Sequence, residues 1–189
     1  MTGRSDQELC EILAKKGAER NAAFDELYRR YSARIYRYSR RILSREEEAD
    51  DILQDTFVRF LNSVEQGKVI ENVAAYLLRI ARNLSLNLET RRPAVVELDE
   101  LHAVYTPSPL ESEETTQMIQ MSLELLPNEQ KEALVLQVYS GLSYQEIADT
   151  MGVPVTTIRN WIVRGKAKMR ETLAQYFETS PQRDTDLQN

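Results

Sequence analysis

The sequence has few of the residues that build metal sites and covalent cross-links. Its 189 residues include one cysteine, Cys10, and one histidine, His102. A lone cysteine cannot form an internal disulfide, and this pair cannot supply the ligands of a structural zinc site. We therefore expect no metal and no cofactor. Two roles stay open for Cys10, a redox or metal sensor and a small apolar residue on the inner face of the first helix, and the second is favoured.

Long apolar runs and catalytic constellations are missing as well. There is no run of about 18 apolar residues. The first ten residues, MTGRSDQELC, lack the charged-then-apolar pattern of a signal peptide. These two absences predict a cytoplasmic protein without membrane insertion. Because no nucleophile–base pair, paired catalytic carboxylates or phosphate-binding loop is present, the sequence predicts a protein that is not an enzyme.

The formal net charge of −6 is unevenly placed. The segment 97–114 carries six carboxylates and no lysine or arginine, so it accounts for the whole net charge. The rest of the chain is neutral overall but contains a basic segment at 29–41, an acidic one at 46–55 and a basic one at 164–170. Three surfaces with different charge preferences are therefore expected.

Apolar residues recur at three- and four-residue spacing along most of the chain, which is the pattern of amphipathic helices. Ser5 and Ser44 each precede a glutamate by three residues, which predicts capping boxes at two helix starts. Periodicity fades in a segment rich in acid and proline. We predict an all-α fold of two small helical bundles joined by a flexible acidic linker: a first domain over 5–92, a linker over 93–115, a second domain over 116–178 and a tail over 179–189.

The stretch SYQEIADTMGVPVTTIRNW, residues 143–161, has the features of a helix-turn-helix. Ser143 and Glu146 form a third capping box, Gly152 ends the first helix, and Pro154 suits the start of the second. The second helix presents Thr156, Thr157, Arg159 and Asn160 near its N-terminus, where a recognition helix meets base edges. Arginine suits guanine and asparagine suits adenine, whereas the later basic residues Arg164, Lys166, Lys168 and Arg170 suit phosphates.

Two residues in this helix have alternative interpretations. Trp161 either stacks on DNA or a partner, or packs at the edge of the core beside Ile158 and Ile162. Gly165 costs roughly 1 kcal/mol against alanine inside a helix, so it marks close packing or a bend.

The order of motifs along nearly the whole chain, from about Leu9 to Leu173, carries a family resemblance. EEEADDILQDTFVRFL is followed by AAYLLRIARNLSLNLETRR and then by LPNEQKEALVLQVYSGLSYQEIADTMGVPVTTIRNW. This arrangement resembles the extracytoplasmic-function (group IV) sigma factors of bacterial RNA polymerase. The resemblance implies a sigma-2 domain that binds polymerase and opens the minus-ten element, and a sigma-4 domain that reads the minus-thirty-five element.

The resemblance also implies roles for individual residues. The core-polymerase-binding signature falls on Asp51, Gln54 and Asp55, which share one helix face. The minus-ten set comprises Asn62, Lys68, Arg79, Arg82, Asn83 and Asn87, with the loop Gly67–Asn72 bordering a pocket for a base that leaves the stack. The minus-thirty-five set comprises Ser143, Gln145, Thr156, Thr157, Arg159, Asn160, Arg164 and Lys168.

Several positions depart from the family pattern or have a plainer interpretation. Asn87 stands where an aspartate is frequent, Trp161 where a basic residue is common, and Gly165 where alanine is common. Tyr76 stands where tryptophan is common, and a core aromatic is its plainer role. Arg79 and Arg82 have a solvated helix face as their alternative.

The expected partners are core RNA polymerase, promoter DNA and an anti-sigma factor, with the chain monomeric when free or 1:1 with its partner. Two other functions stay open, a stand-alone helix-turn-helix transcription factor and a degenerate sigma-like interaction protein. The acid of segment 97–114 is further expected to lie over the basic faces of the free protein and discourage stray DNA binding.

Overall fold

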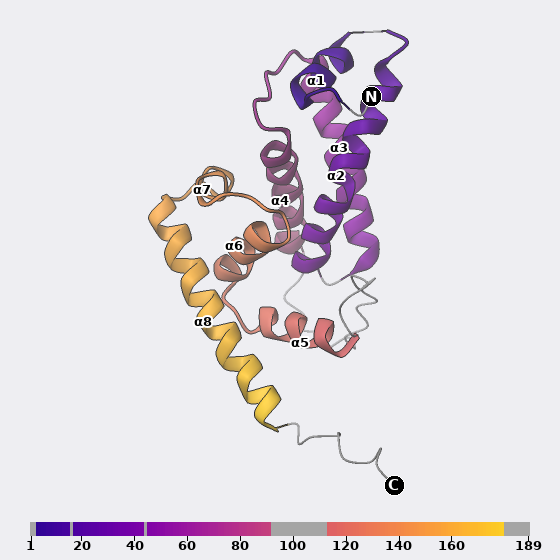
Figure 1. The fold of residues 1–189 in the computed structure, drawn as a ribbon. Helices are drawn as coiled ribbons and strands as arrows, with labels where there is room; N and C mark the ends of the chain where they lie inside the picture. Colours follow the sequence, from indigo (N-terminus) through magenta and orange to yellow (C-terminus); the bar gives the residue numbers. More distant parts are fainter. Residues whose placement is uncertain (1–2, 16, 44, 92–112, 180–189) are drawn as a thin grey trace.

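The computed structural model describes residues 3–15, 17–43, 45–91 and 113–179. Within these ranges the chain is helical and contains no strand, which confirms the predicted all-α class (Figure 1). The helices are α1 (Asp6–Ala14), α2 (Arg20–Ile42), α3 (Glu46–Glu65), α4 (Val73–Arg91), α5 (Glu113–Glu124), α6 (Asn128–Val138), α7 (Tyr144–Met151) and α8 (Val155–Thr179). The acidic residues 97–112, and with them the expected cover over the basic faces, lie outside the described residues.

Helices α1 to α4 form the first bundle, in which α2, α3 and α4 pack against one another and α1 closes one end (Figure 1). The predicted capping box at Ser5 is confirmed, with the Ser5 amide donating to Glu8 at 2.6 Å. Ser44 lies outside the described residues, and α3 begins with Arg45 at the N-cap and no side-chain cap there. The apolar stripes of the sequence meet at the bundle centre, where Leu27, Tyr38, Phe60 and Leu77 are fully buried.

Helices α5 to α8 form the second bundle around α6, whose residues 131–136 are all buried. Figure 1 shows α8 as a long helix along the outside of this bundle, with α7 at its N-terminal end and α5 at the other. The two bundles touch, because α4 packs against α7 and α2 packs against α6. Their buried apolar residues consequently belong to one connected cluster rather than two separate cores.

No helix among the described residues combines the length and the apolar character that a bilayer span needs. The described residues also contain no group of three or more histidine, cysteine or acidic side chains placed to hold a metal ion.

Gly165 lies where α8 crosses α6. A Cβ built at this glycine would come within 2.7 Å of Leu134 Cδ1 and 3.3 Å of Leu134 Cγ. Leu134 is itself buried, with 3% of its surface exposed, so it has little room to move aside. Of the two interpretations offered by the sequence, close packing is therefore the one that the structure supports.

The substitution Gly165→Ala should lower stability even though alanine is the better helix former. Overpacking a core typically costs about 1–3 kcal/mol, which outweighs the gain of roughly 1 kcal/mol in helix propensity. Urea denaturation should show a lower free energy of unfolding for Gly165→Ala, partly recovered by adding Leu134→Val. The variant Ala167→Gly, at an exposed position two residues along, measures how much glycine costs relative to alanine in the same helix when no core packing is involved. A stabilised Gly165→Ala protein would contradict the packing explanation.

Candidate nucleic-acid interface

The helix-turn-helix is formed by α7, a tight turn and α8. Ser143 and Glu146 make the predicted capping box, with the Ser143 amide donating to Glu146 Oε2 at 2.7 Å and the Glu146 amide donating to Ser143 Oγ at 3.3 Å. These bonds lower the pKa of Glu146, so it stays ionised. Gly152 ends α7 at φ 71°, a left-handed conformation that side chains other than glycine rarely adopt. Ile147 and Ile158 are fully buried and fix the two helices against each other.

The N-terminal half of α8 exposes a polar face beside this turn. At about 100° per residue, Thr156, Arg159 and Asn160 fall on one side of the helix. All three are exposed. Arg164 and Lys168 are exposed on the adjoining flank, where Lys168 pairs with Glu171 at 3.1 Å. Thr157 is half-buried, and Ser143 and Gln145 are exposed on α7. The predicted minus-thirty-five residues thus lie on α7 and along α8 as far as Lys168.

Two apolar side chains of α8 bear on recognition, Trp161 on a side that packs on the core and Val163 on the exposed face. Trp161 is half-buried against the hydrophobic core, which supports the packing alternative over stacking on DNA. Val163 is 60% exposed on the same side of the helix as Arg159 and Asn160, and no feature of the sequence singled it out. An apolar side chain at such a place can contact a thymine methyl group in the major groove. Its position one turn after Asn160 was visible in the sequence, but its exposure was not.

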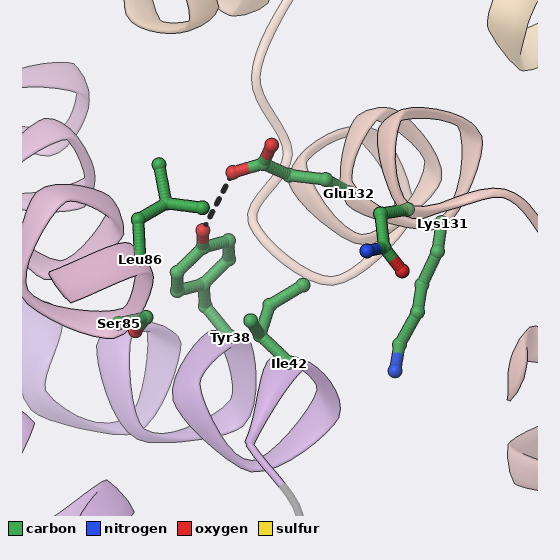
Figure 2. Close-up of a pocket in the computed structure, with 7 residues that line it drawn as sticks. Tyr38, Ile42, Ser85, Leu86, Lys131 and Glu132 are labelled. Carbon is green, nitrogen blue, oxygen red and sulfur yellow. Dashed lines mark hydrogen bonds between the residues drawn. The ribbon is translucent and has the colours of Figure 1, made fainter. Parts of the chain in front are cut away.

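Of the two predicted minus-ten arginines of α4, Arg82 is largely buried in an ion pair, whereas Arg79 remains exposed. Arg82 donates to Glu132 of α6 through both Nε and Nη2, at 2.8 and 3.2 Å, and only 18% of its side chain is exposed. Tyr38 of α2 donates to the same carboxylate at 3.0 Å. Figure 2 shows the Tyr38 hydroxyl directed at Glu132, whereas Lys131 extends away from it. Arg79 Nη2 donates to the main-chain oxygen of Asp149 in α7 at 3.2 Å.

The loop before α4 also meets the second bundle. Asn72 caps α4 by accepting from the Ala75 amide at 2.9 Å, and its amide nitrogen donates to Glu146. Lys68 is exposed, with its ammonium 4.7 Å from the centroid of the Tyr76 ring. Tyr76 is half-buried against the core, as expected of a core aromatic, and donates to Ser63 at 2.9 Å. Asn62 is exposed near this end of α3.

A second surface is formed by α3 and the far side of α4. Asp51, Gln54 and Asp55 are all exposed on α3, as the one-face prediction required. They line a cleft of about 410 Å³ together with Asn87 of α4. Asn87 therefore lies beside the predicted polymerase-binding residues, not beside Arg82. Asn83 is exposed one turn before it. Asn87 and Arg82 are five residues apart in a helix, which turns them to different sides.

Cys10 is half-buried in α1 and packs against the core. Burial, reinforced by the nearby Asp6 carboxylate, raises the pKa of its thiol to about 11. A thiol with this pKa is almost entirely protonated at neutral pH, and the protonated form is a poor nucleophile and metal ligand. Of the two roles offered by the sequence, the structure supports the apolar one.

Comparison with known proteins agrees with this geometry. Residues 27–92 match the family model of sigma-70 region 2, and residues 116–169 match that of sigma-70 region 4. The chain is 32% identical over 169 residues to the ECF RNA polymerase sigma factor SigE of Mycolicibacterium smegmatis, covering 85% of this chain and 65% of that protein. It is 30% identical over 178 residues to SigM, an ECF RNA polymerase sigma factor of Mycobacterium tuberculosis, covering 94% of this chain and 90% of that protein.

The fold has solved counterparts. The sigma factor RpoE of Bartonella quintana, in its co-crystal structure with the anti-sigma factor NepR, superposes with a TM-score of 0.69 at 23% identity, over 80% of this chain and 96% of that one. Two sigma-70 regions on two helical bundles define the class as sigma-70-type transcription factors. Within that class, the chain belongs to the ECF sigma factors, the subunits that give RNA polymerase its promoter specificity.

The thiol of Cys10 should resist alkylation in the folded protein. A rise in pKa from 9.0 to about 11 cuts the thiolate fraction at neutral pH about a hundredfold. Iodoacetamide labelling at pH 7.5, followed by mass spectrometry, should therefore be much slower in the native chain than in the urea-unfolded chain. The rate should still be rising with pH at pH 10. Equal rates in the two states would restore the sensor hypothesis.

Proposed function

We propose a division of labour among three surfaces of this sigma factor. The α3 face with Asp51, Gln54 and Asp55 binds core RNA polymerase. The α4 face with Arg79, Arg82 and Asn83, together with the loop Gly67–Asn72, binds the opened minus-ten strand. The α7–α8 unit reads the minus-thirty-five element. The proposed domain limits are 5–92 and 116–178, with 93–115 as the connection.

The observation that carries the proposal is the separation of these surfaces. The exposed carboxylates of α3 and the exposed Arg159–Asn160 face of α8 belong to different helices of different bundles. One chain can therefore contact polymerase and duplex DNA at the same time. A stand-alone helix-turn-helix regulator has no use for the acidic cleft on α3, so the cleft favours a sigma factor over that alternative.

We further propose that an anti-sigma factor binds this chain and that it works in the cytoplasm, where core polymerase acts. The support for the first point is the likeness in fold to RpoE, which was crystallised with its anti-sigma factor NepR. Reconstituted transcription tests the function itself. Core polymerase with this chain should produce discrete transcripts from genomic fragments, and their start sites should share two upstream elements. Core polymerase alone provides the baseline, and an unchanged transcript pattern would overturn the proposal.

Removing the polar groups of the α3 face should weaken polymerase binding selectively. The triple variant Asp51→Ala, Gln54→Ala, Asp55→Ala should lose affinity for core polymerase by about 10- to 100-fold, as expected when the central side chains of an interface are truncated. Surface plasmon resonance against immobilised core measures the change. The double variant Asp25→Ala, Asp50→Ala removes the same charge from exposed positions and should bind normally. Retained affinity in the triple variant, with an unchanged thermal melt, would contradict the assignment.

Two arginines of α8 should separate base readout from phosphate contact. In promoter binding by the reconstituted holoenzyme, Arg159→Ala should cost about 1–3 kcal/mol and relax the preference at one base pair of the minus-thirty-five element. Arg164→Ala should weaken binding to all sequences alike and reduce the slope of log K against log salt by about one. If Arg159→Ala instead weakens binding to all sequences alike, Arg159 contacts phosphate and does not read a base.

A further inference from the structure

The second bundle contacts four arginines of the first bundle, Arg34, Arg41, Arg79 and Arg82. Arg82 is held by Glu132, Arg79 by the Asp149 carbonyl, and Arg41 of α2 by Gln120 of α5 at 2.7 Å. Arg34, also on α2, approaches Gly141 so closely that a Cβ there would lie 3.1 Å from its Nη2. Gly141 has φ 62°, so glycine suits this position on conformational grounds as well. The contact runs from α5 to α7 and involves side chains from both bundles.

The pairing of Arg82 with Glu132 uses the chemistry by which arginine binds phosphate. A guanidinium presents a planar fork of donors that two oxygens of a carboxylate or of a phosphate satisfy in the same way. The Glu132 carboxylate takes Nε and Nη2 of that fork and leaves the pair largely buried, with 18% and 11% of the two side chains exposed. A DNA phosphate that approached Arg82 would have to displace this carboxylate.

We propose that Glu132 is an intramolecular latch that occupies Arg82 in place of a nucleic-acid phosphate. Arg82 then cannot bind Glu132 and a DNA phosphate at the same time. In the free chain, the contact between the bundles therefore blocks single-stranded DNA from binding at α4. This inference rests on the proposed function of the α4 face. The second bundle supplies the competing ligand, the Glu132 carboxylate.

The placement of Glu132 supports a latch over a structural role within its own bundle. Its hydrogen bonds in the described part of the chain go to Tyr38 and Arg82, both of the first bundle. Its neighbour Lys131, by contrast, pairs with Glu124 of α5 at 2.7 Å. Glu146 of α7 reinforces the closed arrangement by accepting from Asn72. Opening therefore breaks bonds between the bundles while the bonds within each remain.

The closed arrangement leaves the α3 face available. Asp51, Gln54 and Asp55 are exposed although Arg82 of α4 is held by Glu132. Polymerase can therefore bind the closed chain first, and strand binding at α4 follows when the latch opens. The Arg82–Glu132 pair is largely buried, so salt screens it less than it screens a pair at the surface.

The substitution Glu132→Gln tests the latch in the full chain. The glutamine removes the negative charge and replaces one of the two acceptor oxygens by an amide donor, so the two-oxygen pairing with Arg82 is lost. Small-angle X-ray scattering should show a larger radius of gyration than for wild type, with an unchanged helical circular dichroism spectrum. Binding of a short mixed-sequence single-stranded oligonucleotide should become roughly tenfold tighter, which corresponds to an open fraction of about one-tenth in the wild type.

Two variants control for charge and for site. Glu129→Gln makes the same charge change one turn earlier in α6, at an exposed position, and should leave both measurements at wild-type values apart from a small general gain in DNA affinity. Arg82→Gln added to Glu132→Gln should remove the affinity gain while the chain stays expanded. This result supports the proposal, because it traces the gain to the released arginine.

Three results would overturn the latch: a compact Glu132→Gln chain, an expanded one with the oligonucleotide affinity of Glu129→Gln, or a gain that survives the loss of Arg82. Failure of the proposed function is recognised separately. If wild-type chain and core polymerase give no specific transcripts, the sigma assignment of the surfaces fails, whereas the scattering and oligonucleotide comparisons, made without polymerase, still decide the latch.

Discussion

The relation between the two bundles depends on a guanidinium–carboxylate pair, Arg82 of α4 with Glu132 of α6, that both bundles help to bury. Neither charge would be stable there alone, because an unpaired buried charge costs several kcal/mol. Arg82 and Glu132 therefore each have to be paired with the other or hydrated by water. Tyr38, which donates to Glu132, lies beside Ile42 and Leu86 in the pocket shown in Figure 2. Separation of the bundles would hydrate this charged pair, and it would also expose apolar residues that the two bundles bury in one connected cluster.

The sequence predicted the helices well, because amphipathic stripes and capping residues are local. The stripe of α2, the capping boxes at Ser5 and Ser143, and the left-handed stop at Gly152 are all present. Prediction was weaker where geometry is long-range. Gly165 was recognised as unusual, but Leu134, thirty-one residues earlier, decides why it is glycine. The same holds for Arg82, because nothing in its local pattern indicates a partner fifty residues away.

For the candidate sites too, features set by local helical spacing could be predicted, and features set by long-range contacts could not. Exposure of Asp51, Gln54 and Asp55 follows from helical spacing, since the apolar residues around them fix the buried side of α3. The minus-ten set was assembled by resemblance along α4, and helical geometry divides it. Arg79 and Arg82 face the second bundle, whereas Asn87 joins the α3 cleft. A helix that contributes to two surfaces can couple them, because a shift of α4 toward either partner alters the other face.

The cap of α7 has a consequence for how the chain moves. Glu146 closes the capping box with Ser143 and also accepts from Asn72 of the loop before α4. When the loop leaves, the bonds to Ser143 remain, so the first turn of α7 keeps its structure and its ionised carboxylate. Asn72 likewise keeps its bond to the Ala75 amide and still caps α4. In the proposed opening, the two bundles would therefore move as preassembled units, and the helix-turn-helix would need no further folding to bind duplex DNA.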